Sequence, residues 1–308
     1  MYDIEKYYNA HTLEEAISLM KEHPRARLIC GGSDVLIRIR EGKMAGCELI
    51  GIREIEDIKG VSMDEDRTFR IGAATTFSHI TQNELIKKYV PVLGEAVDQV
   101  GGPQVRNIGT IGGNICNGAV SADSAPTCFS LEAQLVLTSF SGTRISSMED
   151  FYLGPGKVNR KEGEILTHIL IPEDHYKGYT GHYIKYSMRN AMDIATLSCS
   201  VVCKADRKNN QLLDVKITFG VAAPVPLRCH KTEEALKGRI IDRDLFTKTE
   251  DLIREEINPR DSWRASKDFR LQIGGEIAKR ALATALWKQN ALEETIYLNL
   301  CGEVETWK

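Results

Sequence analysis

Two short segments, each built around a pair of glycines, constrain this chain of 308 residues more than any other feature. The first is CGGSD at residues 30–34, and the second is TIGGN at residues 110–114. Because glycine lacks a Cβ, the backbone N–H groups of such segments can approach an anion closely, and a diphosphate is the natural guest. A glycine pair also marks ordinary turns, so the pairs taken alone leave both a turn and an anion site open.

Neither segment is by itself a nucleotide-binding fingerprint. The chain has no G-x-G-x-x-G motif of a dinucleotide fold and no G-x-x-x-x-G-K-[ST] motif of a P-loop. The segment GPGK at residues 154–157 resembles the end of a P-loop but lacks its spacing. We therefore expect a turn at that position.

The bulk properties narrow the class of protein. A chain of this length predicts two domains, and 42% hydrophobic residues indicate an ordinary folded protein. The net charge of −3 argues against a nucleic-acid partner, since such proteins usually carry a clustered basic excess. No leader pattern and no run of about 20 apolar residues occurs, so we expect a cytoplasmic protein that does not enter the membrane.

The eight cysteines are scattered and form no C-x-x-C motif, which predicts reduced thiols and no metal or iron–sulfur ligand set. Cys199 and Cys203 are near neighbours in sequence, but they fall in an expected strand. An i, i+4 spacing there separates the Cα atoms by about 13 Å, too far for a disulfide. No Ser-His-Asp, Cys-His or paired-carboxylate pattern stands out, so we expect no catalytic residue.

Helical and extended patterns alternate in the first half of the chain. A capping box at residues 12–15 predicts a helix that ends before Pro24, and residues 27–30 then read as a strand entering the first glycine pair. The glycine-rich residues 107–118 predict a loop. A polar linker at 173–181 precedes three strand-like runs, at 183–188, 194–204 and 212–221, which predict an antiparallel meander, and residues 264–288 predict a long helix.

Five longer motifs resemble one known family over nearly the whole chain. They are ICGGSDVL at 29–36, GPQVRNIGTIGGNI at 102–115, SADS at 121–124, YSMRNAMDIA at 186–195 and FGVAAP at 219–224. The sequence resembles the FAD-binding medium subunits of the molybdenum hydroxylases, and within them the separate FAD subunits of bacterial xanthine dehydrogenase-type enzymes.

This resemblance implies an α+β fold. Residues 1–176 would form a PCMH-type, vanillyl-alcohol-oxidase-like FAD-binding domain. Residues 182–290 would form a domain like the C-terminal domain of CO dehydrogenase flavoproteins, with a three-stranded antiparallel sheet plus helices. Residues 291–308 would be a tail to which the resemblance gives no role.

The resemblance also implies the residues that hold FAD. Residues 27–34 would wrap the diphosphate and ribityl chain, and residues 109–114 would grip the diphosphate from the other side. Ile165, Leu166 and Ile184 either pack near the rings or belong to the plain core. The full set is Arg27, Leu28, Ile29, Cys30, Gly31, Gly32, Ser33, Asp34, Gly109, Thr110, Ile111, Gly112, Gly113, Asn114, Asp123, Ile165, Leu166 and Ile184. Cys30 and Ser33 depart from the commoner family residues, Ala and Thr or His, but keep a small or polar side chain.

The function implied is one step of a larger enzyme. A molybdenum-cofactor large subunit would hydroxylate the substrate, a small subunit would carry the electrons through 2Fe–2S clusters, and FAD on this chain would pass them to NAD. We therefore expect a hetero-oligomer, with xanthine or another purine as the leading substrate. Nicotinate, carbon monoxide and aromatic substrates remain alternatives, as do a stand-alone PCMH-fold flavin oxidase and a non-enzymatic nucleotide-binding module.

Overall fold

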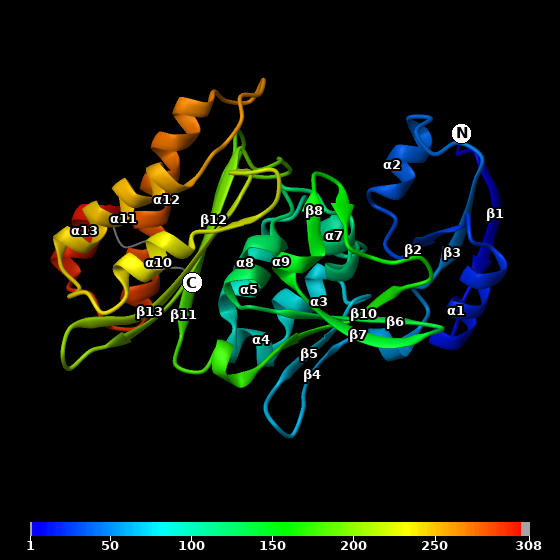
Figure 1. The fold of residues 1–308 in the computed structure, drawn as a ribbon, viewed down its shortest axis with the longest axis horizontal. Coiled ribbons are helices and arrows are strands. Elements are labelled where there is room, and N and C mark those ends of the chain that lie inside the picture. The colour runs from blue at the N-terminus through cyan, green and yellow to red at the C-terminus, as the bar shows by residue number, and fades with distance from the viewer. Residues whose placement is uncertain (1, 303–308) are drawn as a thin grey trace.

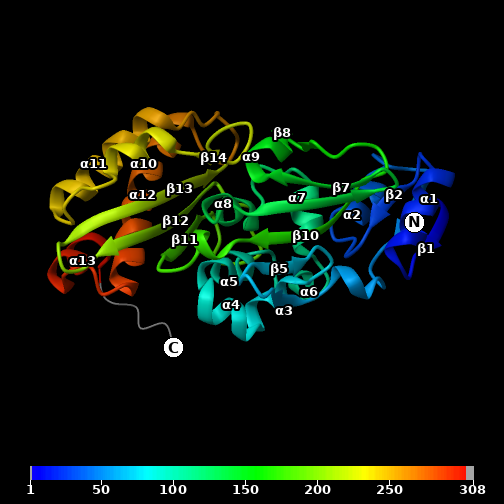
Figure 2. The ribbon, with the colours of Figure 1, turned by 60° about the horizontal axis from the view of Figure 1, so that its bottom comes forward.

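The computed structural model describes residues 2–302 and shows an elongated molecule with its main sheets arranged in a row (Figures 1 and 2). A three-stranded sheet lies at the N-terminal end, a five-stranded sheet in the middle and a four-stranded sheet at the opposite end. Residues 303–308 of the expected tail lie outside the described residues. Within residues 2–302, none of the helices combines the length and apolar character needed to cross a membrane.

The N-terminal unit is a parallel sheet with two helices. Its elements are β1 (Ile4–Asn9), α1 (Leu13–Glu22), β2 (Arg27–Ile29), α2 (Val35–Arg40) and β3 (Cys47–Gly51), with strand order β1-β3-β2. The predicted N-cap is present, since Thr12 Oγ1 accepts the N–H of Glu15. The return contact of the capping box is displaced by one residue, because the Glu15 carboxylate accepts the N–H of His11 and not that of Thr12. The predicted strand before the first glycine pair is β2, so this pair follows the edge strand of the sheet directly.

The middle unit is an antiparallel sheet covered by short helices. Its sheet has the order β4 (Val61–Met63), β5 (Phe69–Gly72), β10 (Ile165–Ile171), β6 (Gln134–Ser139) and β7 (Gly142–Ser147). The other elements are η1 (Glu56–Ile58), α3 (Phe77–Gln82), α4 (Glu84–Tyr89), α5 (Pro91–Asp98), α6 (Pro103–Arg106), α7 (Ile111–Cys116), α8 (Ser124–Ser130), α9 (Met148–Phe151), β8 (Tyr152–Gly154), β9 (Lys157–Val158) and η2 (Glu173–His175). The expected turn in residues 154–157 is the connection of the hairpin β8–β9.

The second glycine segment is a helix, and the prediction of a loop over residues 107–118 was wrong there. Thr110 is the N-cap of α7, and its Oγ1 accepts the N–H of Gly113 at 3.2 Å. Ile111 and Ile115 are fully buried one turn apart, which anchors the helix in the core. Each glycine disfavours a helix by about 1 kcal/mol relative to alanine, so the sequence pattern concealed a helix that tertiary packing stabilises.

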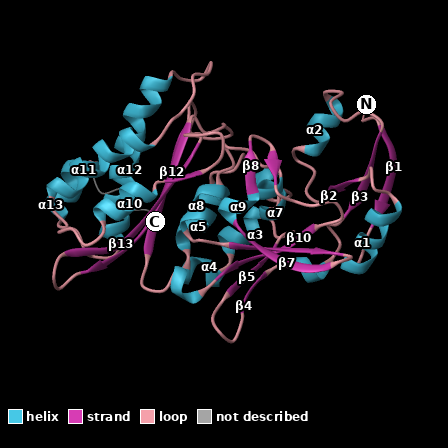
Figure 3. Cartoon of the chain, in the orientation of Figure 1, coloured by secondary structure: helices cyan, strands magenta, loops and turns pink. Residues whose placement is uncertain are grey.

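The C-terminal unit is an antiparallel sheet with helices on its outer face (Figure 3). Its elements are β11 (Thr180–Tyr186), β12 (Leu197–Asp206), β13 (Gln211–Gly220), β14 (Leu227–Arg228), α10 (His230–Leu236), α11 (Arg243–Glu256), α12 (Lys267–Lys288) and α13 (Glu294–Cys301). The three long strands correspond to the predicted meander, and β14 adds a short fourth strand. β11 begins inside the segment expected as a linker, and the long helix starts after its N-cap, Ser266.

Helix α8 joins the two larger units, because it is completely buried and packs against β12 and β13. Two of its hydroxyls cross the seam: Thr127 Oγ1 bonds Ser200 Oγ at 3.1 Å, and Ser130 Oγ bonds Thr218 Oγ1 at 2.9 Å. Beside them lies a buried ion pair in which Arg228 donates Nε and Nη2 to Glu233, both at 2.7 Å. Arg228 also donates Nη1 to the carbonyl of Phe129 in α8 at 3.3 Å, so this contact and the two hydroxyl bonds hold the two units in one relative position.

We predict that Arg228→Met destabilises the fold strongly. The substitution leaves the buried Glu233 carboxylate with the N–H of Ile217 as its remaining hydrogen-bond donor and with the exposed His230 ring 3.6 Å away. Loss of the partner of a buried charge costs about 3–5 kcal/mol. The matched control is Arg254→Met, which removes an exposed i, i+4 partner of Glu250 on α11 and should change stability by less than about 0.5 kcal/mol. Urea unfolding followed by circular dichroism measures both. Equal midpoints for the two variants would contradict the prediction.

Candidate cofactor site

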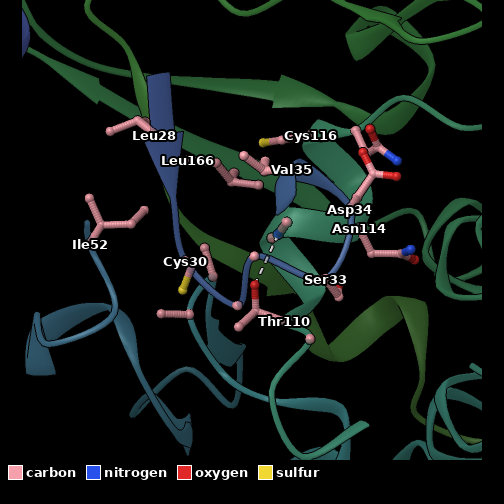
Figure 4. Close-up of a pocket in the computed structure, with 18 of the residues that line it drawn as sticks. Leu28, Cys30, Ser33, Asp34, Val35, Ile52, Thr110, Asn114, Cys116 and Leu166 are labelled. Atoms are coloured by element: carbon pink, nitrogen blue, oxygen red, sulfur yellow. Dashed lines mark hydrogen bonds between the residues drawn. The ribbon is translucent and has the colours of Figure 1, made fainter. Parts of the chain in front are cut away.

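A cavity lies between the β2–α2 connection on one side and α7 on the other (Figure 4). Most of the residues implicated from the sequence line it. These are Arg27, Leu28, Cys30, Gly31, Gly32, Ser33, Asp34, Gly109, Thr110, Gly112, Gly113, Asn114, Ile165 and Leu166. The two glycine segments, remote in sequence, therefore face one space. Their contact with a cofactor stays a prediction.

The two segments also touch each other, and glycine makes this approach possible. A Cβ built on Gly31 would lie 2.0 Å from the carbonyl oxygen of Ile108, a distance no real side chain occupies. The next residue, Gly32, has φ of +71°, in the left-handed region that favours glycine. Both glycines are thus required by the path of the chain before any ligand is considered.

The first segment offers backbone donors that the protein does not use. Among the described residues, the N–H groups of Gly32, Ser33 and Asp34 make no hydrogen bond to a protein acceptor. Successive free N–H groups in a tight turn form a concave donor set that suits an anion. The Ser33 hydroxyl adds a further polar group at the cavity wall. This segment can therefore hold a diphosphate.

The second segment behaves differently, because its backbone donors are already taken. The N–H of Ile111 bonds Thr75 O, that of Gly112 bonds Ala73 O at 2.9 Å, and those of residues 113 and 114 bond Thr110. In this structure these N–H groups already have acceptors within the protein, and the expected grip of residues 109–114 on the diphosphate stays a prediction. What it offers instead is the surface of Gly113, where a Cβ would meet only Thr110 Oγ1 within 4 Å, and the side chain of Asn114. The Oδ1 atom of Asn114 accepts a hydrogen bond from the Ser124 hydroxyl at 2.7 Å, which leaves Nδ2 as a donor.

Asp123 lies behind the cavity wall and does not line it. Its carboxylate accepts the hydroxyl of Tyr183 at 2.8 Å and pairs with the ammonium of Lys185 at 2.9 Å. Burial raises the pKa of Asp123 against the opposing effect of the Lys185 charge. Since Tyr183 and Lys185 belong to β11, the carboxylate links the wall of the cavity to the C-terminal unit. Its expected contact with FAD stays a prediction.

Three other residues of the expected set do not line the cavity. Ile29 packs in a small core cluster with residues of α2, Ile111 is buried in the middle unit, and Ile184 packs against the C-terminal core. For Ile184 this is the plain-core alternative left open above. Successive residues of a strand face opposite sides, and successive residues of a helix are rotated by about 100° around its axis, so a contiguous motif cannot line a cavity with every member.

The cavity also contains residues that the sequence reasoning missed. They are Val35, Arg38, Met44, Ile52, Ala73, Ala74, Phe77, Val100, Val105, Cys116, Asn117 and Arg160. Cys116 and Asn117 follow the second segment directly, so their inclusion could have been inferred from the helix periodicity had α7 been recognised. Arg160 comes from the loop after β9, and no pattern in the sequence connects it to either glycine pair.

The lining groups give no sign of acid, base or nucleophile chemistry. Burial raises the pKa of the Cys116 thiol to about 12, and burial also raises the pKa of Cys30. Both thiols therefore stay protonated at neutral pH, and a protonated thiol is a poor nucleophile. No histidine lines the cavity as the described residues form it. A site of this kind can bind and position a reactive group without supplying the chemistry.

Comparisons with known proteins identify both units. Residues 2–174 match the family described as the FAD binding domain in molybdopterin dehydrogenase. Residues 182–285 match the CO dehydrogenase flavoprotein C-terminal domain. The residues between these ranges, 175–181, connect η2 to β11 and include the first residues of that strand.

Individual relatives agree with this. The chain is 36% identical to the xanthine dehydrogenase FAD-binding subunit of Escherichia coli O157:H7, over 93% of this chain and 97% of that one. It is 30% identical to the nicotinate dehydrogenase FAD-subunit of Eubacterium barkeri, over 83% and 87%. A solved carbon monoxide dehydrogenase from Hydrogenophaga pseudoflava, lacking the Mo-pyranopterin moiety, superposes with a TM-score of 0.87 at 27% identity, over 94% of this chain and 99% of that one.

We predict that Gly112→Ala destabilises the protein by about 1–3 kcal/mol, the usual range for overpacking a close contact. A Cβ there would lie 2.5 Å from Ala73 Cβ and 2.7 Å from Ala73 O. The matched control is Gly94→Ala in α5, where the nearest heavy atom would be 3.6 Å away. That change should be neutral or should stabilise by up to about 1 kcal/mol. Thermal and urea unfolding measure both, and a Gly112 variant as stable as the Gly94 variant would refute the close approach of α7 to β5.

Proposed function

This chain belongs to the FAD-binding subunits of the molybdenum hydroxylase family, and from that membership we propose how it works. FAD occupies the cavity between residues 27–34 and 109–116. It receives electrons from the 2Fe–2S clusters of a small partner subunit and passes them to NAD. A molybdenum-cofactor large subunit completes the hetero-oligomer, and the complex works in the cytoplasm.

The main support for this binding site is that the two glycine segments differ in how many of their backbone N–H groups are already hydrogen-bonded. The N–H groups of residues 32–34 have no acceptor within the described protein, whereas those of residues 111–114 do. The first segment therefore binds the diphosphate through its main chain, and the second closes over it with Gly113 and Asn114. A Cβ at Gly113 would meet Thr110 Oγ1 at 2.9 Å and no other heavy atom within 4 Å. The space in front of Gly113 is therefore open to a ligand.

The chemistry belongs to the cofactor. FAD supplies hydride and single-electron transfer when it is bound, so the protein needs to hold, orient and shield it. Apolar side chains line the same cavity as the glycines and exclude water from it, among them Leu28, Ile52, Ile165 and Leu166. The protonated thiols of Cys30 and Cys116 add contact surface and no competing nucleophile.

Substrate and acceptor are finer proposals. We place xanthine or another purine first, because the identity of 36% to a xanthine dehydrogenase FAD-binding subunit exceeds the 30% to a nicotinate dehydrogenase FAD-subunit. Carbon monoxide and aromatic substrates follow. The substrate contacts would lie on the molybdenum subunit, so the only support that this chain gives for a substrate is its similarity to subunits of known enzymes. NAD is the proposed acceptor on the same ground.

We predict that the purified chain is yellow, that the flavin released from it is FAD, and that NADH bleaches its absorbance near 450 nm under anaerobic conditions. Gly113→Val should lower the affinity for FAD by at least about tenfold, because the branched side chain enters the cavity. Gly94→Val lies outside the cavity and should bind FAD normally. A colourless wild-type protein that cannot be reconstituted with FAD would overturn the proposal.

We also predict that the chain co-purifies from its native host with proteins that carry molybdenum and iron, and that the complex reduces NAD with a purine. Metal analysis of the complex and assays with xanthine, nicotinate, carbon monoxide and an aromatic N-heterocycle decide the substrate. Turnover with one of the other three alone would replace the purine. A chain that purifies alone and reduces oxygen without metal would instead indicate a stand-alone flavin oxidase.

A further inference from the structure

The charge of the cavity is opposite to the charge of the chain. The protein carries a net charge of −3, yet the charged residues that line the cavity are three arginines and one aspartate. The arginines are Arg27, Arg38 and Arg160, and the aspartate is Asp34. The lining therefore has a net charge of plus two. A diphosphate diester such as that of FAD carries two negative charges at neutral pH.

None of the three guanidinium groups is neutralised by the rest of the described chain, in which they form no ion pair. Many of the other arginines form ion pairs, including the buried Arg228 with Glu233 and Arg144 with Glu164. Asp34 lies one helical turn before Arg38, but its carboxylate and that guanidinium are not within ion-pair distance. Positive charge left unpaired beside free backbone donors points to an anionic ligand.

Arg38 and Arg160 reach the cavity from opposite walls. Arg38 belongs to α2, which begins just after the free N–H groups of the first segment. Arg160 belongs to the loop that follows β9, and the β8–β9 hairpin before this loop is tied to the C-terminal end of α7 by the hydrogen bond from Gly156 N to Gly118 O. Both residues are exposed, as expected of groups at a cavity mouth.

An ion pair between two other residues, Arg144 and Glu164, holds the loop that carries Arg160. The positive charge of Arg160 has no carboxylate partner in this arrangement. The buried Glu164 receives Arg144 Nε at 2.5 Å and Arg144 Nη2 at 2.8 Å, a two-pronged contact that satisfies its charge. Arg160 donates Nη1 to the backbone carbonyl of Glu164 at 2.7 Å, which fixes the side chain but does not neutralise it. No other hydrogen bond from its side chain occurs in the described part of the chain, and the residue lines the cavity.

We propose that Arg38 and Arg160 form a two-sided cationic bracket for the diphosphate of FAD. The bracket rests on the proposed function, since it assumes that FAD occupies this cavity, and it adds side-chain contacts to the main-chain donors of residues 32–34. It makes binding of the dinucleotide dependent on ionic strength, while binding of riboflavin, which has no phosphate, is independent of it. Arginine suits the role because its planar fork can donate two hydrogen bonds to one phosphate.

The test measures FAD binding to the full chain after removal of flavin, by quenching of flavin fluorescence at low and high salt. Arg38→Gln and Arg160→Gln should each raise the Kd for FAD about tenfold at low salt, the effect of losing one hydrogen bond to a charged group. Both should flatten its salt dependence and leave the Kd for riboflavin unchanged. Arg160→Lys should restore part of the affinity, because it keeps the charge without the fork.

Matched controls lie next to each arginine. Arg40→Gln on the same helix and Lys161→Gln on the same loop remove a positive charge outside the cavity lining, and should change the Kd for FAD less than twofold. Unchanged thermal midpoints for all variants exclude loss of folding as the cause.

Two results would overturn the bracket and leave the proposed function intact. One is FAD binding by Arg38→Gln and Arg160→Gln within twofold of the wild type. The other is an unchanged Kd for FAD with a raised KM for NADH in the flavin-loaded protein, which would assign the arginines to the diphosphate of the acceptor. Failure of the wild type to bind FAD at all would overturn both the bracket and the proposed function.

Discussion

The structure depends on a contact between two pieces of backbone that no larger residue would permit. Gly31 lies against the carbonyl of Ile108, so the N-terminal unit approaches the start of the second segment with almost no side chain between them. Gly112 lies against Ala73, so α7 packs equally closely beside the end of β5 within the middle unit. These contacts set the glycine-lined part of the cavity, and side chains such as Leu28, Ile52 and Leu166 line the rest. Interiors pack densely and yield little, so a single added methyl group at either glycine changes the separation of the walls.

The side of the cavity formed by α7 is held in place by contacts that lead to the C-terminal unit. Ser124 bonds Asn114, the neighbouring Asp123 pairs with Lys185 of β11, and α8 continues into the buried seam with β12 and β13. The C-terminal unit thus supports the cavity without lining it. Its contribution is to fix the position of Asn114 and α7.

Local signals predicted the two glycine pairs as special positions and the strand leading into the first segment, because a capping box and strand periodicity are local patterns. The α+β fold was implied by the resemblance of the longer motifs to a known family. The sequence concealed α7, whose helix depends on the burial of Ile111 and Ile115 against a distant sheet. It also concealed Arg160, which reaches the cavity only through the packing of the β8–β9 hairpin on α7. Asp123 was singled out from the sequence, but its pairing with β11 required the tertiary fold.

The division of donors between the walls follows from these constraints. A segment that caps a helix and abuts a strand must use its own N–H groups, as residues 111–114 do. A turn that follows the edge strand of a parallel sheet has no neighbouring carbonyl groups that its N–H groups must bond, so the N–H groups of residues 32–34 remain free. Free amides alone are weak partners for a doubly charged group, and unpaired arginines beside them complete the neutralisation. The Arg144–Glu164 pair matters for this reason: without Arg144, the buried Glu164 carboxylate would compete with a ligand for Arg160.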